Sequence, residues 1–423
     1  MAEFKPVLLT LPSLTPPLAV EVLPFGLTIH RVYVQADGKT HDIVIGPEDP
    51  QGHTEVKYVN TVIGRYANRV PVGTHNVSKD GIQGSFTTVT NESPEVSLHG
   101  GLKGWDFAIW SKYDTLSDAT LFTKSEVETI TQAAPGDASA AIFHYTSPDG
   151  EEGYEGTLLT ETLVALVGPR GVASGPAEHA VGSVVIVYRS RLQEKDKVTP
   201  INLTQHWGFN LDASLKDDPE AQSILNHRVT LKASHIADRH ANFLPTGNFI
   251  PVAEADNGSL AHVHDGKRVG DNWPSGAGYD DYYVLSERTT RQSPHRIKTS
   301  EFGPSLNVVK DIFERPNENV LELSSEKSGL AVKFDSNQDG LMFYTNNFSN
   351  EKGYRKKIHG GTGEKGDGYR KQSATFIEFH EPLAAFKYPT TTSTDTLLTS
   401  NEIYNNYVRA DVFLRQVEHT GAA

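Results

Sequence analysis

The stretch NVLELSSEKSGLAVKFDS (residues 319–336) decides the fold class of this chain. Its apolar residues come in short runs bounded by Asn, Gly and Asp, a pattern typical of strands joined by turns. Runs of the same kind recur along the chain: LAVEVLPFGLTIHRVYVQ (18–35), GSVVIVYRSRL (182–192), HRVTLKAS (227–234), ATFIEFHEP (374–382) and YVRADVFLRQV (407–417). No long run has the apolar spacing of an amphipathic helix, and we expect helical turns only near residues 221–227. The sequence therefore predicts an all-β fold, a large antiparallel β-sandwich with function carried on strand ends and loops.

The composition is uniform enough to predict one domain over residues 1–423. Large all-β folds often run to this length as a single unit. Three segments rich in Gly, Ala, Ser or charge have no clear period, near residues 125–141, 168–182 and 351–371. We expect these segments to be surface insertions in the domain.

Charge and cysteine content exclude several classes of protein. Lys and Arg number 39 against 53 Asp and Glu, a net charge of −14, which works against binding to nucleic acid. The chain has no Cys, which excludes disulfides, thiolate catalysis and Cys-ligated metals. No apolar stretch reaches the roughly 18 residues of a membrane-spanning helix, and the N-terminus does not resemble a signal peptide. We expect a cytoplasmic protein, a monomer or homodimer, without a membrane partner.

Two motif-like patterns are better explained as loops and turns. Gly361, Gly363 and Gly366 form a GxGxxG, but it neither follows an apolar strand nor opens a helix. The run 335–346 begins like a calcium-binding EF-hand loop, yet its twelfth residue is Asn346 instead of Glu and both flanks resemble strands. The 17 histidines show no metal-ligand spacing, so we expect no metal and no other cofactor.

Chemically capable residues gather in a few short stretches. The main ones are IGRYANRV (63–70), VSLHGGLKGWDFAIW (96–110), INLTQHWGFNL (201–211), GYDDYYVL (278–285) and FIEFHEP (376–382). Taken alone, each has a structural explanation: His206 as a core histidine, Glu378 as a solvent-facing residue, Arg69 as an ion-pair partner. From the residues alone, the chain is a largely β protein, expected to be an enzyme with a His/Glu site.

Together these stretches resemble the galactose mutarotase (aldose 1-epimerase) family. The resemblance extends from about Gly26 to the final strand, and the landmarks occur in the family's order: IGRYANRV, LHGGLKGWD, SPDGEEGYEG (147–156), PINLTQHWGFNL, LPTGNFIPV (244–252), GYDDYY, FYTNNF (343–348) and FIEFHEP. The family fold is a large antiparallel β-sandwich, in agreement with the strand pattern.

The resemblance implies a role for each matching residue. His206 corresponds to the general acid and Glu378 to the general base of an isomerase that interconverts the α and β anomers of a free aldohexose such as galactose or glucose. The remaining matches correspond to groups that hold sugar hydroxyls: Asn68, Arg69, His99 and Asp280. The implied ligand is a small sugar.

Two departures from the family pattern put substrate preference in question. Trp207 and Gly208 stand where family members often carry Ser and Tyr, and Met342 stands where a Gln is common. Trp105, Trp207 and Trp273 are candidates to stack on a sugar face, although core packing is expected for at least two of them.

The implied chemistry suits these residue types. A carboxylate can take the proton of the anomeric hydroxyl while an imidazole, with an unperturbed pKa of about 6.5, protonates the ring oxygen. The ring then opens to the aldehyde and closes on the other face. Two alternatives stay open: a hexose-6-phosphate 1-epimerase, which would need a cationic clamp on the phosphate, and a sugar-binding protein without turnover. A glycoside hydrolase using Asp280 and Glu378 would leave His206 without an evident role.

Overall fold

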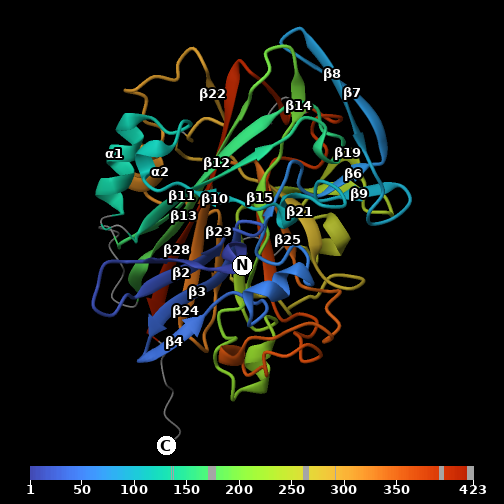
Figure 1. Cartoon of the computed structure of the whole chain (residues 1–423). Coiled ribbons are helices and arrows are strands. Elements are labelled where there is room, and N and C mark those ends of the chain that lie inside the picture. The colour runs from blue at the N-terminus through green and yellow to red at the C-terminus, as the bar shows by residue number, and fades with distance from the viewer. Residues whose placement is uncertain are drawn as a thin grey trace, which may run out of the picture.

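Strands dominate the computed structural model, which describes residues 1–134, 136, 138–169, 178–260, 266–290, 292–389 and 395–416. The largest sheet has ten strands (Figure 1). In spatial order they are β10 (Ser111–Lys112), β11 (Ala140–Ser147), β12 (Leu158–Val167), β13 (Glu178–Leu192), β28 (Glu402–Arg415), β24 (Leu330–Ser336), β23 (Leu321–Ser324), β17 (Arg228–Leu231) and β20 (Lys267–Arg268), with β22 (Arg296–Lys298) also paired to β28.

Two smaller sheets and four strand pairs complete the architecture. One sheet contains β1 (Val7–Thr10), β2 (Leu18–Leu23), β3 (Thr28–Ala36) and β4 (Lys39–Asp42). The other contains, in spatial order, β16 (Trp207–Phe209), β26 (Thr375–His380), β25 (Gly340–Tyr344), β21 (Asp280–Leu285), β18 (Ala233–Arg239) and β19 (Pro245–Pro251). The pairs are β14 (Val198–Pro200) with β27 (Leu397–Thr399), β15 (Thr204–Gln205) with β5 (Val62–Ile63), β6 (Arg69–Pro71) with β9 (Val96–Leu98), and β7 (Gly73–Lys79) with β8 (Ile82–Thr88).

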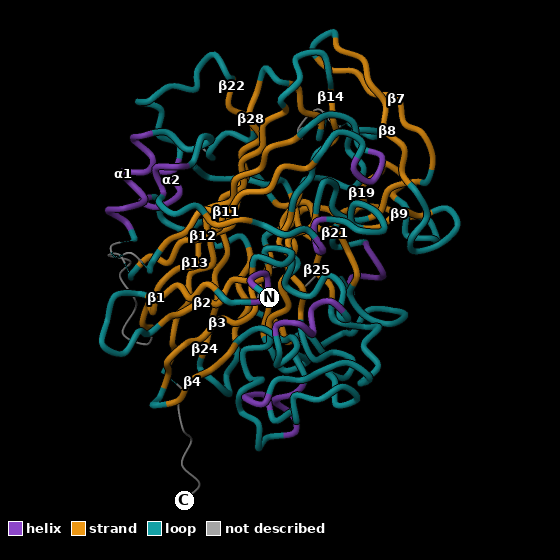
Figure 2. The backbone as a smooth tube through the Cα atoms, viewed as in Figure 1, coloured by secondary structure: helices purple, strands orange, loops and turns teal. Residues whose placement is uncertain are grey.

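Adjacent strands in these sheets run antiparallel throughout the described part of the chain. One continuous core lies beneath the large sheet and both smaller sheets, with members such as Val20, Val332 and Ile377. Figure 2 shows the same dominance of strands. The predicted all-β, antiparallel fold is therefore confirmed.

The central strand β13 is apolar on both faces because both faces are covered. Val184, Ile186 and Tyr188 point into the main core, whereas Val185 and Val187 join a second apolar cluster. That cluster lies under the helices α1 (Lys124–Ala133) and α2 (Val309–Glu314), which sit side by side against the sheet (Figure 1). A strand covered on both faces has a continuous apolar run instead of an alternating one.

Helix α1 occupies most of the segment 125–141, in which the sequence analysis found no clear period. A capping box opens the helix: the Thr123 hydroxyl accepts the Glu126 N–H, and the Glu126 carboxylate accepts the Thr123 N–H at 2.9 Å. Glu126 is buried and bound at 2.6 and 2.7 Å by the two Nη atoms of Arg189. Burial of Ile130 beneath the helix contributes about 1.5–3 kcal/mol. The signal Thr-x-x-Glu was present in the sequence.

The remaining helical segments are single 3-10 turns: Ala2–Phe4, Pro50–Thr54, Trp105–Phe107, Leu116–Asp118, Glu151–Gly153, Pro219–Gln222, Ala255–Gly258 and Lys357–His359. Helical turns expected at 221–227 occur two residues earlier, since Asp218 caps a turn whose first residue is Pro219.

Both motif-like patterns have the structure that the sequence predicted. The calcium-like run forms a turn between β24 and β25, and Gly361, Gly363 and Gly366 lie in a loop. In the second predicted insertion, residues 178–182 begin β13, and residues 170–177 lie outside the described residues.

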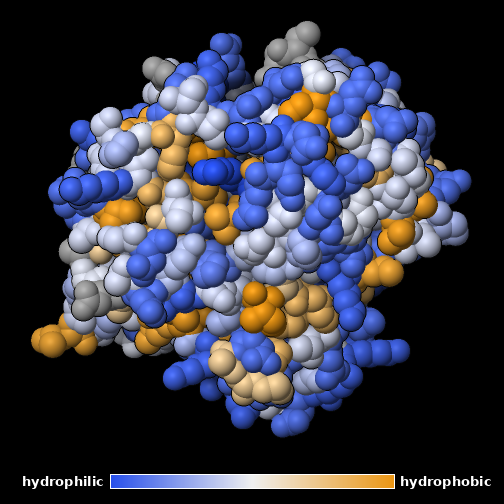
Figure 3. Space-filling view, turned by 45° about the horizontal axis from the view of Figure 1, so that its top comes forward, coloured by the Kyte–Doolittle hydropathy of each residue, from blue (hydrophilic) through white to orange (hydrophobic). Residues whose placement is uncertain are grey.

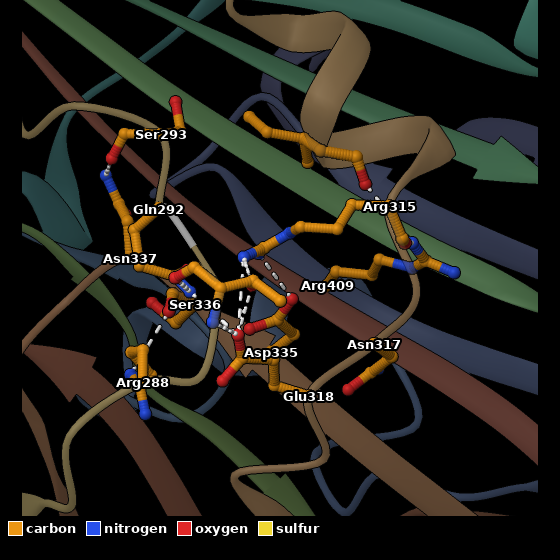
Figure 4. A network of polar contacts seen from close by, with 12 residues as sticks. Arg288, Gln292, Ser293, Arg315, Asn317, Glu318, Asp335, Ser336, Asn337 and Arg409 are labelled. Atoms are coloured by element: carbon orange, nitrogen blue, oxygen red, sulfur yellow. Dashed lines mark hydrogen bonds and ion pairs between the residues drawn. The ribbon is translucent and has the colours of Figure 1, made fainter.

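A polar network joins α2 to strands β24 and β28 (Figure 4). The Arg315 guanidinium donates to Asp335 at 2.8 Å, and Arg409 donates to the Arg315 carbonyl oxygen at 2.8 Å. The face shown in Figure 3 is mostly hydrophilic with scattered hydrophobic patches, as the net charge of −14 leads one to expect. In the part of the chain that is described, no helix is long and apolar enough to cross a membrane.

Candidate active site

A cavity of about 530 Å³ opens on the face of the six-stranded sheet that points away from the core. All six residues that the sequence singled out line it: Asn68, Arg69, His99, His206, Asp280 and Glu378. They come from segments up to 310 residues apart, and the ends of β6, β9, β21 and β25 meet in this region (Figure 1). The sequence therefore predicted which residues share the cavity.

Strand alternation explains which side chains face the cavity. In β26, Ile377 and Phe379 enter the core, so Phe376 and Glu378 point the opposite way. In β25, Met342 lies opposite Glu378 in the strand register and points the same way. A one-residue slip of register would bury the carboxylate in the core.

His206 lies between β15 and β16 and is held by its backbone. Its N–H donates to the Thr61 carbonyl at 2.9 Å, and its own carbonyl accepts the Asn60 N–H at 2.8 Å. The imidazole Nε2 lies 3.1 Å from Glu378 Oε1, and the two side chains are 10% and 3% exposed. Among the described residues, Glu378 Oε2 has no hydrogen-bond partner. An oxygen left in that state is available to a ligand.

His99 and Asn68 bind each other through two reciprocal contacts. The Asn68 N–H donates to His99 Nδ1 at 3.2 Å, and the His99 N–H donates to the Asn68 carbonyl at 3.1 Å. With Nδ1 accepting, the proton of the neutral ring resides on Nε2. His99 therefore presents a donor, and its ring lies 5.2 Å from the His206 ring.

Two further residues hold these segments in place. Gly100 has a φ of +89°, and a Cβ there would lie 2.1 Å from the Gly64 carbonyl oxygen. Arg65 is buried and donates at 2.7 Å to the Ser147 hydroxyl and at 3.0 Å to the Glu155 carbonyl. Arg65 thereby joins the IGRYANRV and SPDGEEGYEG segments, and this contact explains why both segments are structurally important.

Arg69 is clamped between two carboxylates. Its Nε and Nη2 each donate to Glu92 at 2.9 Å, and Nη2 lies 3.5 Å from Asp280 Oδ2. Asp280 Oδ2 has no hydrogen-bond partner among the described residues. The sequence analysis missed Glu92, which lies in a loop with no motif around it.

The electrostatics suit proton transfer. Burial raises the pKa of Glu378, but contact with His206 is the largest opposing effect, and the pKa falls from 4.5 to about 2, so Glu378 is ionised near neutral pH. Burial holds the pKa of His99 well below its usual range, which keeps that ring neutral. Burial also raises the pKa of Asp280, although Arg69 and Arg239 oppose the rise.

The departures from the family pattern have distinct structural outcomes. Trp207 packs in the core against Phe209 and Phe334, and neither it, Trp105 nor Trp273 lines the cavity. The side chain of Met342 does line it.

Gly208 makes room for a neighbouring ring. A Cβ at Gly208 would lie 2.7 Å from the ring of Phe376, which covers this position and lies 4.7 Å from the His206 ring. The aromatic ring beside His206 in the cavity wall is therefore supplied by Phe376 of β26 and not by residue 208. Other aromatic residues of the cavity that the sequence analysis missed are Tyr58, Tyr344, Phe348, Tyr354 and Tyr369.

Two groups of side chains in the described residues are close enough to share a metal ion, with ligand atoms within 4.8 Å of one another. They are His99, His206 and Glu378, and a second group outside the cavity, His295, Asp339 and Glu381. In the first group, three of the possible ligand atoms already have partners within the protein. His206 Nε2 and Glu378 Oε1 contact each other, and His99 Nδ1 accepts the Asn68 N–H.

Comparison with known proteins gives a consistent result. The family model for aldose 1-epimerases matches residues 179–408, which include His206, Asp280 and Glu378. The galactose mutarotase of Bos taurus is 26% identical over 363 residues, covering 85% of this chain and 82% of that protein. The human galactose mutarotase is 27% identical over 333 residues, covering 78% of this chain and 75% of that protein.

The crystal structure of a GalM/aldose epimerase homologue from C. elegans superposes with a TM-score of 0.68 at 18% identity. The match covers 97% of this chain and 99% of that one. The fold is thus that of galactose mutarotase-like proteins. The chain belongs to the aldose 1-epimerase family, and its activity is that family's isomerisation, aldose 1-epimerisation.

Proposed function

We propose that the chain interconverts the α and β anomers of a free aldohexose such as galactose or glucose, with Glu378 as general base and His206 as general acid. The observation that carries this proposal is the 3.1 Å contact between His206 Nε2 and Glu378 Oε1 on the cavity floor. Galactose is named in several of the relatives, such as the bovine and human proteins.

The proposed proton transfers use two atoms, Glu378 Oε2 and His206 Nε2. Glu378, ionised near neutral pH, takes the proton of the anomeric hydroxyl through Oε2. The proton on His206 Nε2 passes to the ring oxygen as the bond between C1 and that oxygen breaks. The aldehyde rotates about the C1–C2 bond, and the same steps in reverse close the ring on the other face. Each well-placed transfer typically contributes about 10²–10⁴-fold to the rate.

Asn68, Arg69, His99 and Asp280 orient the sugar. His99 donates through Nε2, the Arg69 guanidinium donates, and Asp280 accepts from hydroxyls through Oδ2, which accepts no hydrogen bond from the described residues. Glu92 holds the guanidinium so that it points into the cavity. Fixing the sugar in this way lowers the entropy cost of reaching the reactive geometry.

A free sugar fits the charges better than a sugar phosphate does. In the basic segment beside the cavity, Lys356 is fully buried and bound to Asp42 at 2.8 Å, and Arg355 is bound to Asp367 at 2.7 Å. These two cations are already matched, so neither Lys356 nor Arg355 is available to clamp a phosphate. The direct bond between His206 and Glu378 likewise argues against a glycoside hydrolase, which needs a pair of carboxylates.

We further propose that the chain acts as one domain in the cytoplasm, as a monomer or a homodimer. The continuous core beneath all three sheets supports the single domain. Sedimentation velocity of the purified chain gives the oligomeric state, and a mass above that of a dimer would contradict the proposal.

Polarimetry tests the reaction. Freshly dissolved α-D-galactose or α-D-glucose is followed to equilibrium with the wild type, with Glu378→Gln and with His206→Asn. We expect the wild type to shorten the approach to equilibrium and both variants to lose most of that effect. A wild type that leaves the buffer rate unchanged with both sugars would rule out the free-hexose substrate.

A further inference from the structure

A second cavity, of about 740 Å³, lies at the other end of the six-stranded sheet. Val284, near the end of β21, lines it, whereas Asp280, at the start of the same strand, lines the cavity of the candidate active site. Between the two cavities lies an apolar cluster, which Val284 contacts from one side and whose Met342 lines the first cavity: Ala237, Tyr282, Met342 and Leu383. The proposed sugar reaction therefore does not account for the second cavity.

Three potential metal ligands converge on the wall of the second cavity. His295 directly precedes β22, Asp339 directly precedes β25, and Glu381 directly follows β26. His295 and Asp339 line the cavity, and the paired ends of β25 and β26 bring Glu381 beside them. One ligand atom of each residue lies within 4.8 Å of the other two. Their spacing along the chain forms no local motif, which is why the sequence analysis expected no metal.

Buried polar atoms at this place lack hydrogen-bond partners. Glu381 is fully buried, and its Oε1 lies 2.6 Å from His295 Nδ1, but its Oε2 has no hydrogen-bond partner among the described residues. Gln338 also lines the cavity and is fully buried, and neither its Nε2 nor its Oε1 has a partner in the described part of the chain. Buried polar atoms are rarely left in this state, so these atoms indicate a ligand.

The two carboxyl groups of the cluster need a positive charge between them. Burial, followed by the charge of Glu381, raises the pKa of Asp339 to about 8. Within the described residues no Lys or Arg forms an ion pair with Asp339 or Glu381. Arg288 lines the cavity but donates to the carbonyl oxygens of Ser336 and Gln338 at 3.2 and 3.0 Å (Figure 4). A shared proton or a metal cation can therefore occupy the space between the carboxyl groups.

Backbone contacts hold the three ligands in place before any ion binds. The Asp339 carbonyl accepts the Leu285 N–H, and the His295 carbonyl accepts the Asn405 N–H, each at 2.9 Å. The Asn202 side chain binds Glu381 twice: its Oδ1 accepts the Glu381 N–H at 3.0 Å, and its Nδ2 donates to the Glu381 carbonyl at 3.1 Å. Ligands that are already positioned lower the cost of binding.

The ligand types favour zinc over magnesium or calcium. One imidazole nitrogen and two carboxylate oxygens, with water in an open position, form a common set for Zn²⁺, whereas Mg²⁺ and Ca²⁺ prefer oxygen alone. Ligand atoms about 2.0–2.2 Å from a tetrahedral Zn²⁺ lie about 3.4 Å apart, so His295 Nδ1 and Glu381 Oε1 would separate by less than about 1 Å. The Gln338 amide can bind a zinc-bound water.

We propose that His295, Asp339 and Glu381 bind a divalent transition-metal ion of the zinc type beside the second cavity. The ion replaces the proton between the carboxyl groups. It joins β22 of the ten-stranded sheet to β25 and β26 of the six-stranded sheet, so it stabilises the packing of the two sheets and takes no part in the sugar reaction. The inference is independent of the proposed function, because the two sites share no residue.

The test uses the full chain, stripped of metal with EDTA, dialysed and titrated with zinc chloride. Calorimetry should show one ion bound per chain. Thermal unfolding should rise by about 3 °C when free zinc exceeds its dissociation constant about 100-fold. Asp339→Asn should weaken zinc binding by at least about 10- to 100-fold. Magnesium chloride should bind more weakly than zinc chloride.

Two controls define where the ion binds. Glu287→Gln removes a carboxylate that lines the same cavity but does not belong to the cluster, so it should bind zinc as the wild type does. His206→Asn removes a ligand from the sugar cavity, where His99, His206 and Glu378 are also close enough to hold an ion. Zinc binding that survives His206→Asn and is weakened in Asp339→Asn supports the proposal.

His295→Gln repeats the test from another segment. The His295 side chain is 21% exposed, so this variant provides the measurement if Asp339→Asn does not fold. A wild type that binds no zinc would overturn the proposal and leave a shared proton between the carboxyl groups. Zinc binding lost in His206→Asn but unchanged in His295→Gln would assign the ion to the sugar cavity. Equal weakening in Glu287→Gln and Asp339→Asn would show non-specific attraction.

Discussion

Replacing Glu378 by Gln is the most informative single perturbation of this enzyme. The amide has nearly the same shape, and its oxygen can still accept the His206 Nε2–H that lies 3.1 Å from Oε1. It cannot take a proton from the anomeric hydroxyl. General-base catalysis is worth about 10²–10⁴-fold, so kcat should fall by that factor, an increase in the barrier of about 3–5 kcal/mol.

The same change has a cost in stability that can be worked out separately. The native structure lowers the pKa of Glu378 from 4.5 to about 2, which favours the ionised form by about 3 kcal/mol. Up to about that amount is lost in Glu378→Gln. The rates of the wild type and the variant must therefore be compared at equal folded fraction, which circular dichroism measures.

The assay is polarimetry with α-D-galactose, fitted for kcat and KM, together with calorimetric binding of the sugar. The chain offers a matched control in Glu381→Gln, because Glu381 is also buried and bound to a histidine, with His295 Nδ1 2.6 Å from Oε1, but does not line the cavity. A rate for Glu378→Gln within threefold of wild type would refute the base assignment. An equal loss in both variants would attribute the effect to the fold.

Three further outcomes are expected. Gly100→Ala should lower the free energy of unfolding in urea by more than about 1–3 kcal/mol, because the backbone has a φ of +89° and the new Cβ would lie 2.1 Å from the Gly64 carbonyl oxygen. Gly81→Ala is the control: it has a similar φ of +79° but nothing within 4 Å of the new Cβ, so it should lose less stability. Equal losses would contradict the steric argument. Arg69→Lys should raise KM for galactose about 10- to 100-fold with a smaller effect on kcat, because an ammonium cannot reproduce the two hydrogen bonds that the guanidinium donates to Glu92. An unchanged KM would show that Arg69 does not bind the sugar. The stability advantage of the wild type over Glu378→Gln should be complete above about pH 4.5 and decline as the pH falls toward 2, because the pKa of this carboxyl is lower in the folded state than in the unfolded state. Urea titrations of both proteins at several pH values measure this difference in stability. A difference that does not change with pH would show that folding does not lower the pKa of Glu378.

The sequence by itself determined the strand-rich fold and the residues that we propose for the acid–base site. Alternation in FIEFHEP places Glu378 on the face opposite Ile377 and Phe379 whatever the partner strands are, because successive side chains of a strand point to opposite faces. The order of short motifs identified six of the residues that line the cavity, namely Asn68, Arg69, His99, His206, Asp280 and Glu378. The helix α1 was also encoded locally, by the capping box of Thr123 and Glu126.

Only the tertiary structure decided which residues support that site and how far the cavity extends. Glu92 meets Arg69 across a loop, and no local pattern predicts a contact between a loop carboxylate and a strand guanidinium. Phe376 covers Gly208 because β16 and β26 are paired, a relation between segments more than 160 residues apart. The segment 351–371 is anchored by Lys356, whose three acceptors on His30, Asp42 and Val44 lie more than 300 residues earlier in the chain. Local pattern specifies the face on which a side chain lies, whereas contacts between distant segments exist only once the sheets have packed.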